Sequence, residues 1–143
     1  MYPQWFKRRE GPGWTGILMA ENDHRKIRQV LAQFVEAWNA RNADAFANLY
    51  TDPHVDVNHT PPVETRAATV AVLRKRFERS AARLSVSSDE IIVFGDWAVQ
   101  RGAITISFDG HTEHLRYIEV LRREDDGQWR VHWGIDAPLK GDA

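Results

Sequence analysis

The sequence contains no cysteine among its 143 residues. Disulfide bonds, thiolate nucleophiles and zinc sites with cysteine ligands are therefore excluded. The chain also lacks an excess of charge of either sign, because 19 lysines and arginines face 20 aspartates and glutamates, for a formal net charge of -1. This balance does not favour nucleic acid or an anionic membrane as a partner.

The chain has no apolar run that approaches the roughly 20 residues of a membrane-spanning helix. The N-terminus also lacks the apolar core and the small-residue cleavage site of a secretion signal. We therefore expect a cytoplasmic protein that has no membrane as a partner.

A length of 143 residues suits one domain with one hydrophobic core. Residues 1–20 differ from the rest, because aromatic side chains and a basic run lie there among glycine and proline. No repeat or linker divides the remainder. We expect an N-terminal extension over residues 1–20 and a single domain over residues 21–143.

A first amphipathic helix is predicted over residues 27–38, where apolar side chains recur every three or four positions. Asn22 or Asp23 precedes that stripe and is expected to cap the helix. A second, short helix is expected to begin at Asn42 or Asp44. The first part of the domain is therefore predicted to be helical.

Residues 54–59 alternate like a short strand, which the proline at Pro61 stops. Thr65 then has the position and the side chain of a helix N-cap. We expect a third amphipathic helix to follow it and to end near Ala82. The three helices are in an order that allows them to cover one face of a sheet.

Long strands are predicted over residues 84–94 and 97–108, and Asp109-Gly110 favours a tight turn into a further strand. With a two-residue turn, Gly102 faces Tyr117 across the strand pair. In the 97–108 strand, Trp97 is out of phase with the apolar residues that follow Gly102. A one-residue bulge near Gly102 is expected, because it brings all these apolar side chains onto one face.

The turn around Asp126-Gly127 allows two registers for the last strand. A two-residue turn places Trp133 on the face opposite Leu121. A three-residue loop with Gly127 in the left-handed region places Trp133 and Leu121 on the same face. We prefer it because the apolar side chains of both strands then lie on one face of the sheet. The preferred register puts Trp129, Val131, Trp133 and Ile135 inward with Leu115, Tyr117, Glu119 and Leu121, and puts Asp136 outward.

Two segments carry a resemblance to a known family. The segment FVEAWNARNADAFANLYTD, residues 34–52, is close to a "W...D...L...Y..D" pattern, and DGQWRV, residues 126–131, is close to a "dG.W.i" hairpin. Both patterns are typical of the SnoaL-like and ketosteroid-isomerase-like branch of the nuclear transport factor 2-like superfamily, which the chain resembles over residues 21–138. Residues 61–68 depart from the branch at its glycine-containing entry to the third helix.

The resemblance implies an α+β fold: a cone-shaped, curved antiparallel sheet with three N-terminal helices on its concave face. It also implies a pocket for a small apolar molecule between the sheet and the helices. Some relatives isomerise, cyclise, dehydrate or hydrolyse such molecules without a cofactor, whereas others only bind a ligand or associate with other chains. Both a proton-transferring enzyme and a non-catalytic binding or association module therefore stay open.

Glu119 is the first catalytic candidate, because the preferred register places it mid-strand on the inner face. Burial raises the pKa of a carboxyl group, which suits a base that removes a proton beside a carbonyl. Tyr117 is a candidate hydrogen-bond donor to the oxygen of that carbonyl. The alternative is a Glu119 that is paired with an arginine or exposed to water.

Asp56 and His59 are further catalytic candidates, on the short strand that lies at the pocket wall in the resembling families. In a regular strand they point to opposite sides, so both reach the pocket only if the chain bends before Pro61. The alternative is a solvent-facing Asp56 with a hydrogen-bonded His59. Asp136 matches the position of an aspartate in SnoaL-like proteins, but its outward register argues against catalysis unless the last strand is bulged.

Large side chains from several elements are candidate ligand-binding residues, with the alternative that they only fill the core. The six histidines offer no pair with the spacing of metal ligands, so we expect no metal. Ile118 and Val120 lie amid polar residues on the predicted outer face and favour a modest homodimer contact. The ligand-binding candidates are Trp38, Tyr50, Trp97, Arg101 and Trp133.

Overall fold

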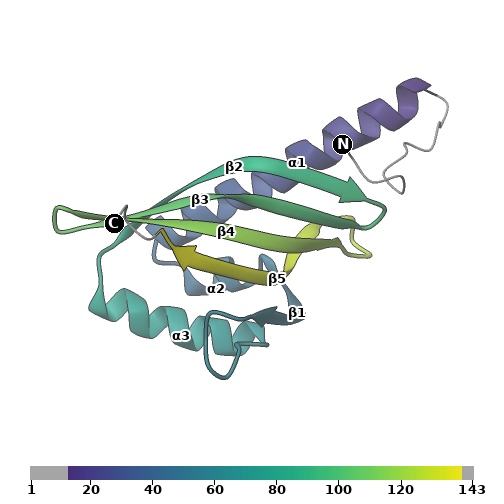
Figure 1. Ribbon diagram of the computed structural model, residues 1–143. Coiled ribbons are helices and arrows are strands. Elements are labelled where there is room, and N and C mark those ends of the chain that lie inside the picture. The colour runs from purple at the N-terminus through teal and green to yellow at the C-terminus, as the bar shows by residue number, and fades with distance from the viewer. Residues whose placement is uncertain (1–12, 140–143) are drawn as a thin grey trace.

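The computed structural model describes residues 13–139, which form an α+β fold of three helices and five strands. In Figure 1 the strands make one sheet, and the helices lie to one side of it. The expected fold class is confirmed. The elements are α1 (Gly13–Asn39), α2 (Ala43–Ala47), β1 (Tyr50–Asp56), α3 (Arg66–Arg79), β2 (Arg83–Phe94), β3 (Trp97–Phe108), β4 (His111–Arg123) and β5 (Trp129–Pro138).

The sheet has the strand order β1-β5-β4-β3-β2. Strands β2 to β5 are antiparallel to their neighbours, as expected, but β1 pairs with β5 in parallel. The sheet is therefore mixed, and the expectation of a purely antiparallel sheet is wrong. The short β1 closes the edge of the sheet beside α3 (Figure 1).

Helix α1 begins earlier than the sequence pattern predicted. It starts at Gly13, so the expected cap at Asn22 or Asp23 is wrong. Asp23 instead lies buried inside the helix, where its carboxylate accepts a hydrogen bond of 2.9 Å from Arg123 and one of 3.4 Å from the Trp129 indole. Of the expected extension, residues 13–20 are helical and residues 1–12 lie outside the described part of the chain.

Side-chain caps fix the starts of the other two helices. The Asn42 side chain accepts a hydrogen bond from the backbone of Ala45, and the Thr65 hydroxyl accepts one from the backbone of Ala68. Both predicted N-caps are therefore confirmed. Helix α3 ends at Arg79, three residues before the expected end.

The first strand also differs from its prediction. Strand β1 covers Tyr50–Asp56, whereas the sequence predicted residues 54–59. The register between β1 and β5 shifts between Tyr50 and Val55, so this strand is irregular. The alternation of residues 54–59 therefore does not mark the paired segment.

The core lies between α1 and the inner face of the sheet. Buried apolar side chains from α1 meet those of strands β2 to β5, and a smaller group joins α1, α2 and α3 around Trp38 and Leu73. None of the helices within residues 13–139 is both long and apolar enough to cross a membrane. The main cluster consists of Ile27, Val30, Phe34, Ile91, Ala98, Leu121, Trp129 and Val131.

The β3–β4 pairing has the predicted register throughout, with Gly102 opposite Tyr117. The expected bulge lies in β2 instead of β3, because the shift falls between Ser88 and Glu90 while β3 stays regular. Trp97 therefore stays out of phase with the inner residues of β3, on the outer face of the sheet. The prediction that Trp97 faces inward is wrong.

The β4–β5 turn matches the preferred loop, since Gly127 has a φ of 79°. A second bulge follows: Val131 pairs with Leu121, but Trp133 pairs with Val120, so one residue of β5 is extra. Beyond this bulge, the β5 side chains that regular alternation would place inward point outward, and the others point inward. Trp133 is 52% exposed and Ile135 is 46% exposed, so their predicted inward position is wrong.

Close backbone approach makes Gly102 a sensitive position. A Cβ atom added there lies 1.9 Å from the backbone oxygen of Ser87, in the neighbouring strand. We expect Gly102→Ala to lower the free energy of unfolding by roughly 3 kcal/mol or more, because the backbone must move to relieve this overlap. Denaturant unfolding measures the change.

The matched control is Gly134→Ala, in the same sheet. An added Cβ at Gly134 meets nothing closer than 3.9 Å. Its free energy of unfolding is expected to change by less than about 1 kcal/mol. Equal losses in the two variants contradict the assignment of close approach to Gly102.

Candidate functional site

Three neighbouring strands place two carboxylates on either side of a glycine. In the sheet, Gly134 pairs with Asp56 of β1 on one side and with Glu119 of β4 on the other. Adjacent strands are about 4.8 Å apart, so the two acidic residues are separated by roughly 10 Å. Because Gly134 has no side chain, the space between them stays open.

That space is part of a cavity of about 220 Å³ between the sheet and the helices. Asp56, Glu119 and Asp136 line its polar part. Its apolar part includes Leu31, Phe34, Trp38 and Phe46 from the helices and Val86, Ile104 and Leu115 from the strands. The cavity is smaller than the roughly 300–1,000 Å³ that is usual for drug-sized ligands.

Glu119 faces the cavity as predicted, and burial raises its pKa to about 7. The charge of Asp136 adds to this shift, whereas a hydrogen bond from the Gln100 amide opposes it. That bond is long, at 3.4 Å, and no arginine pairs with Glu119 among residues 13–139. The Glu119 carboxyl group is therefore poised to exchange a proton near neutral pH.

Asp136 also faces the cavity, so its predicted outward position is wrong. The cause is the extra residue in β5, which moves Asp136 to the inner face. Asn58 binds it twice, since the Asn58 amide donates to the carboxylate at 3.1 Å and its oxygen accepts from the Asp136 backbone at 3.0 Å. Burial, and secondarily the charge of Asp56, raise the pKa of Asp136.

The chain bends after β1, and this bend brings Asp56 and His59 together. His59 Nε2 lies 3.6 Å from a carboxylate oxygen of Asp56. Asp56 lines the cavity, whereas the half-exposed His59 stands beside it and not on the cavity wall. Of these two candidates, Asp56 is therefore the one placed to contact a ligand.

Tyr50 and Tyr117 both line the cavity, but their hydroxyl groups differ. The Tyr117 hydroxyl donates a hydrogen bond of 3.0 Å to the backbone oxygen of Ser87, so its proton is already engaged. The Tyr50 hydroxyl makes no hydrogen bond with the other residues of the 13–139 segment. Burial raises the pKa of both groups, so both stay protonated.

Three of the five predicted ligand-binding residues lie away from the cavity. Trp97 and Trp133 are on the outer face of the sheet, Trp97 because β3 is regular and Trp133 because β5 is bulged. Arg101 is also outward and forms an ion pair of 3.1 Å with Glu90. Trp38 and Tyr50 do line the cavity.

The sequence reasoning missed Asn58, Gly134 and Gln100. Gln100 is almost fully buried beside Glu119, and its side-chain oxygen has no hydrogen-bond partner among the described residues. A buried glutamine at a position that alternates with apolar residues was a usable signal. The roles of Asn58 and Gly134 depend on the β5 bulge, for which the sequence carries no clear sign.

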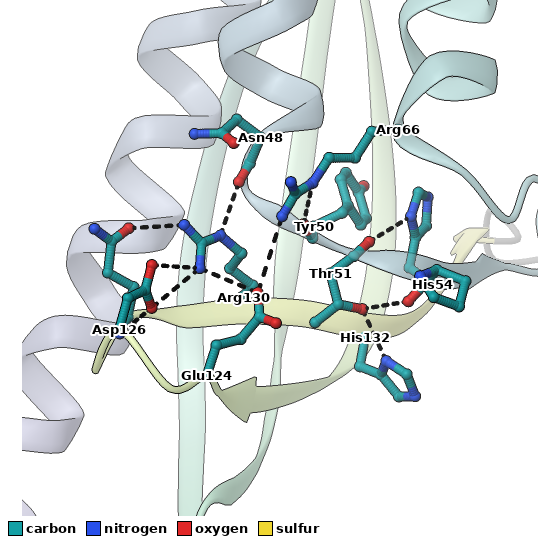
Figure 2. A network of polar contacts seen from close by, with 11 residues as sticks. Asn48, Tyr50, Thr51, His54, Arg66, Glu124, Asp126, Arg130 and His132 are labelled. Carbon is teal, nitrogen blue, oxygen red and sulfur yellow. Dashed lines mark hydrogen bonds and ion pairs between the residues drawn. The ribbon is translucent and has the colours of Figure 1, made fainter.

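Figure 2 shows a polar network that holds the start of β1. Arg66 donates to the backbone oxygen of Tyr50 at 2.9 Å, and Arg130 donates to that of Asn48 at 3.1 Å. Glu124 lies between the two arginines, 3.9 Å from Arg66 and 3.1 Å from Arg130. The network fixes the backbone from which the Tyr50 ring enters the cavity wall.

A larger hollow of about 700 Å³ lies between α1, α2 and the β4–β5 turn. It is an open groove, and its wall mixes amide, charged and small side chains. Asp126 is there, but hydrogen bonds from the Gln128 backbone and from Arg130 lower its pKa, which makes it a weak base. The smaller cavity therefore holds the better catalytic candidates.

No three histidine or acidic side chains within residues 13–139 gather closely enough to hold a metal ion. The carboxylates of the cavity are spread along three strands and are not arranged around one point. Their arrangement suits proton transfer and hydrogen bonding to an organic ligand.

The model of the SnoaL-like domain matches residues 31–132 of the chain, which run from the last third of α1 to the beginning of β5. The chain belongs to the SnoaL-like domain family. This places it in the nuclear transport factor 2-like superfamily, as the sequence motifs indicated. No curated protein matches the sequence.

Solved structures share this SnoaL-like architecture. The chain is similar to a nuclear transport factor 2-like protein with a cystatin-like fold from Novosphingobium aromaticivorans, with 19% identity, a TM-score of 0.77 and coverage of 95% of this chain and 94% of that one. It is also similar to a protein of unknown function from Mycobacterium tuberculosis, with 17% identity, a TM-score of 0.75 and coverage of 82% of this chain and 77% of that one. A third similar structure is a ketosteroid isomerase-like protein from Erwinia carotovora atroseptica, with 19% identity, a TM-score of 0.67 and coverage of 80% of this chain and 94% of that one. At this level of identity the likenesses show the fold alone.

The raised pKa of Glu119 predicts a pH dependence of stability. Between the ordinary pKa of 4.5 and about 7, the folded state holds a proton that the unfolded state has released. The stabilisation is therefore complete below pH 4.5 and is lost as the pH rises through 7. In wild type, the free energy of unfolding is expected to decline by at most about 3 kcal/mol between pH 4.5 and about pH 7 because of this group, and Glu119→Gln is expected to remove that decline.

The measurement is the free energy of unfolding of wild type and Glu119→Gln from pH 4.5 to pH 8. The difference between the two proteins isolates Glu119 from the other titrating groups, such as His54. A constant difference across this range contradicts the raised pKa of Glu119.

Proposed function

We propose that this SnoaL-like protein transfers a proton on a small, carbonyl-bearing molecule without a cofactor, as an isomerase, cyclase or lyase. Glu119 acts as the base: it takes a proton from the carbon beside the carbonyl, and the electron pair moves toward the carbonyl oxygen. Returning the proton at another carbon yields an isomer, and loss of a leaving group yields an elimination product. Both outcomes conserve atoms and need no oxidant or reductant.

The observation that carries the proposal is the position of Glu119. Its carboxyl group has a pKa of about 7 and faces a cavity across the bare backbone of Gly134. A base is most effective when its pKa lies near the working pH. Structural glutamates on a sheet surface do not need this combination of burial and open space.

Two further carboxylates support the same chemistry. Asp56 and Asp136 line the polar part of the cavity, and the pKa of Asp136 is raised. Neighbouring acidic groups with different environments can hold different protonation states at one pH. Asp136 can therefore hold a proton and donate it to the other carbon, while Glu119 releases the proton it removed to water.

The size of the cavity supports a small substrate. About 220 Å³ is below the usual range for drug-sized ligands, so a molecule of one or two rings suits it better than a steroid. The aromatic rings of Phe34, Trp38 and Phe46 offer contact to an apolar body. These features favour a compact cyclic ketone as a first probe.

Hydrogen exchange tests the proposal directly. Wild-type protein is expected to speed the exchange of the α-hydrogens of cyclohexanone or cyclohex-2-enone for deuterium in D₂O, as followed by ¹H NMR. The rate is expected to rise with pH through about 7, where Glu119 loses its proton. Glu119→Gln is expected to lower the rate by at least about 100-fold, since it removes the base.

The matched control is Glu113→Gln, which removes another carboxyl group from the wall of the same cavity. Glu113 is exposed and lies near the β3–β4 turn, so exchange is expected to continue at the wild-type rate. No acceleration by the wild-type protein, or equal rates in wild type and Glu119→Gln, would refute Glu119 as the base.

A homodimer through the outer face of the sheet is the second part of the proposal. Phe94, Ile118, Trp133 and Ile135 are 53%, 46%, 52% and 46% exposed there. Exposed aromatic and aliphatic side chains that gather on one face are typical of an interface. The β5 bulge supplies part of this surface, since it turns Trp133 outward beside Trp97 of the regular strand β3.

Light scattering after size exclusion tests the dimer. Trp133→Glu is expected to shift the protein toward the monomer mass, because it buries a charge in the interface. The control is Ala71→Glu, an exposed position on α3 in the helical layer, which is expected to leave the mass unchanged. A wild-type protein that runs as a monomer at high concentration overturns this part of the proposal.

A further inference from the structure

Tyr50 enters the cavity with its ring held on three sides. The His54 ring stacks on it with centroids 4.5 Å apart, and the rings of Phe34 and Phe46 lie at 5.2 and 6.0 Å. Arg66 holds the Tyr50 backbone oxygen (Figure 2). The position of the ring is therefore fixed by packing before any ligand binds.

The support behind Tyr50 is itself uncharged. His54 is almost completely buried, and burial lowers its pKa, so its imidazole is neutral. His54 Nδ1 donates to the backbone oxygen of Thr51 at 2.9 Å, and its Nε2 accepts from the Thr69 hydroxyl at 3.1 Å. Both ring nitrogens are thus satisfied, and the stack on Tyr50 has a single orientation.

The Tyr50 hydroxyl is the free donor of the polar part of the cavity. The Tyr117 hydroxyl donates to Ser87, and the Asn58 amide donates to Asp136. The Trp38 indole donates to the backbone oxygen of Ala82. The Tyr50 hydroxyl has no such partner among residues 13–139, and the raised pKa keeps its proton in place.

Arg76 also lines the cavity, but it differs from Tyr50 in position. It is exposed, and its guanidinium group lies 5.6 Å from the centre of the Trp38 ring. Its charge lowers the pKa of Asp136 but is not among the charges that shift the pKa of Glu119 or Tyr50, so it lies on the Asp136 side of the cavity, toward solvent.

The charges near Tyr50 limit what can approach it. Glu119, Asp56 and Asp136 all lie near enough to the Tyr50 hydroxyl to raise its pKa. An anionic ligand group placed there meets several carboxylates, and like charges in a desolvated site repel strongly. An uncharged oxygen acceptor meets the hydroxyl donor without that repulsion.

From these observations we infer that the cavity selects small uncharged ligands and binds their acceptor oxygen through the Tyr50 hydroxyl. Carboxylate- and phosphate-bearing molecules are excluded from it. The inference deepens the proposed function, on which it rests for the identity of the site. It makes Tyr50, and not Tyr117, the residue that orients the carbonyl toward Glu119.

The test compares cyclohexanone with methylenecyclohexane, which has the same shape but no acceptor oxygen. Tyr50→Phe is expected to weaken cyclohexanone binding by roughly threefold to tenfold, the value of one hydrogen bond, and to leave methylenecyclohexane binding unchanged. Cyclohexanecarboxylate is expected not to bind the wild-type protein. Ligand-observed NMR titration gives all three affinities.

The matched control is Tyr117→Phe, which removes the other hydroxyl group of the cavity wall. It is expected to lower the melting temperature, because the Ser87 oxygen loses its donor, and to keep the preference for cyclohexanone. A structural role alone would affect ketone and alkene equally, so the ligand pair separates anchoring from folding.

A second measurement has its main result in the wild-type protein alone. The ¹³C resonance of the carbonyl carbon of bound cyclohexanone is expected to move downfield in wild type, as it does when a donor binds the oxygen, and to lose this shift in Tyr50→Phe. An unshifted resonance in wild type, binding of the carboxylate as tight as that of the ketone, or no ketone binding at all overturns the inference.

The outcomes also separate this inference from the proposed function. Glu119→Gln is expected to keep the Tyr50-dependent binding of cyclohexanone while it loses hydrogen exchange. Hydrogen exchange by a protein whose cyclohexanone binding does not depend on Tyr50 refutes this inference alone. Cyclohexanone binding that depends on Tyr50, in a protein that catalyses no hydrogen exchange, refutes only the role of Glu119 as the base.

Discussion

The extra residue in β5 is the constraint on which the cavity depends. A strand alternates its side chains between two faces, so one added residue exchanges the faces for everything that follows. Before the bulge, Trp129 and Val131 are buried in the core. After it, Gly134 and Asp136 face inward, and the indole of Trp133 is left outside. The open space over Gly134 exists because of this exchange.

That space is energetically unfavourable for the folded protein and useful for chemistry. Glu119 and Asp136 lie in it without an arginine partner among the described residues, and the raised pKa values report the cost of their ionisation. Buried carboxylates are normally paired because desolvation is expensive. The aromatic core around Phe34 and Trp38 stabilises the domain enough to tolerate the site.

The sequence predicted those features that depend on local rules. The Asp109-Gly110 turn fixes the register of the strands that it joins, and the Asn42 and Thr65 caps mark the starts of their helices. The predictions of these features were therefore correct. The bulge was not predictable, because an inward Trp133 makes an equally coherent apolar face. Apolar periodicity does not distinguish a core from an exposed outer face, and the predictions for Trp97, Trp133 and Asp136 failed for this one reason.

The same bulge gives the fold an unusual sensitivity to strand register. A one-residue slip of β5 beyond Val131, so that His132 pairs with Val120, would restore regular alternation, turn the Trp133 indole into the hollow beside Glu119, and carry Asp136 out to solvent. One step of register thus separates a domain with an acidic, hollow interior from one whose interior is filled. A lineage built on this sheet can gain or lose a ligand site without altering any helix, turn or core contact elsewhere.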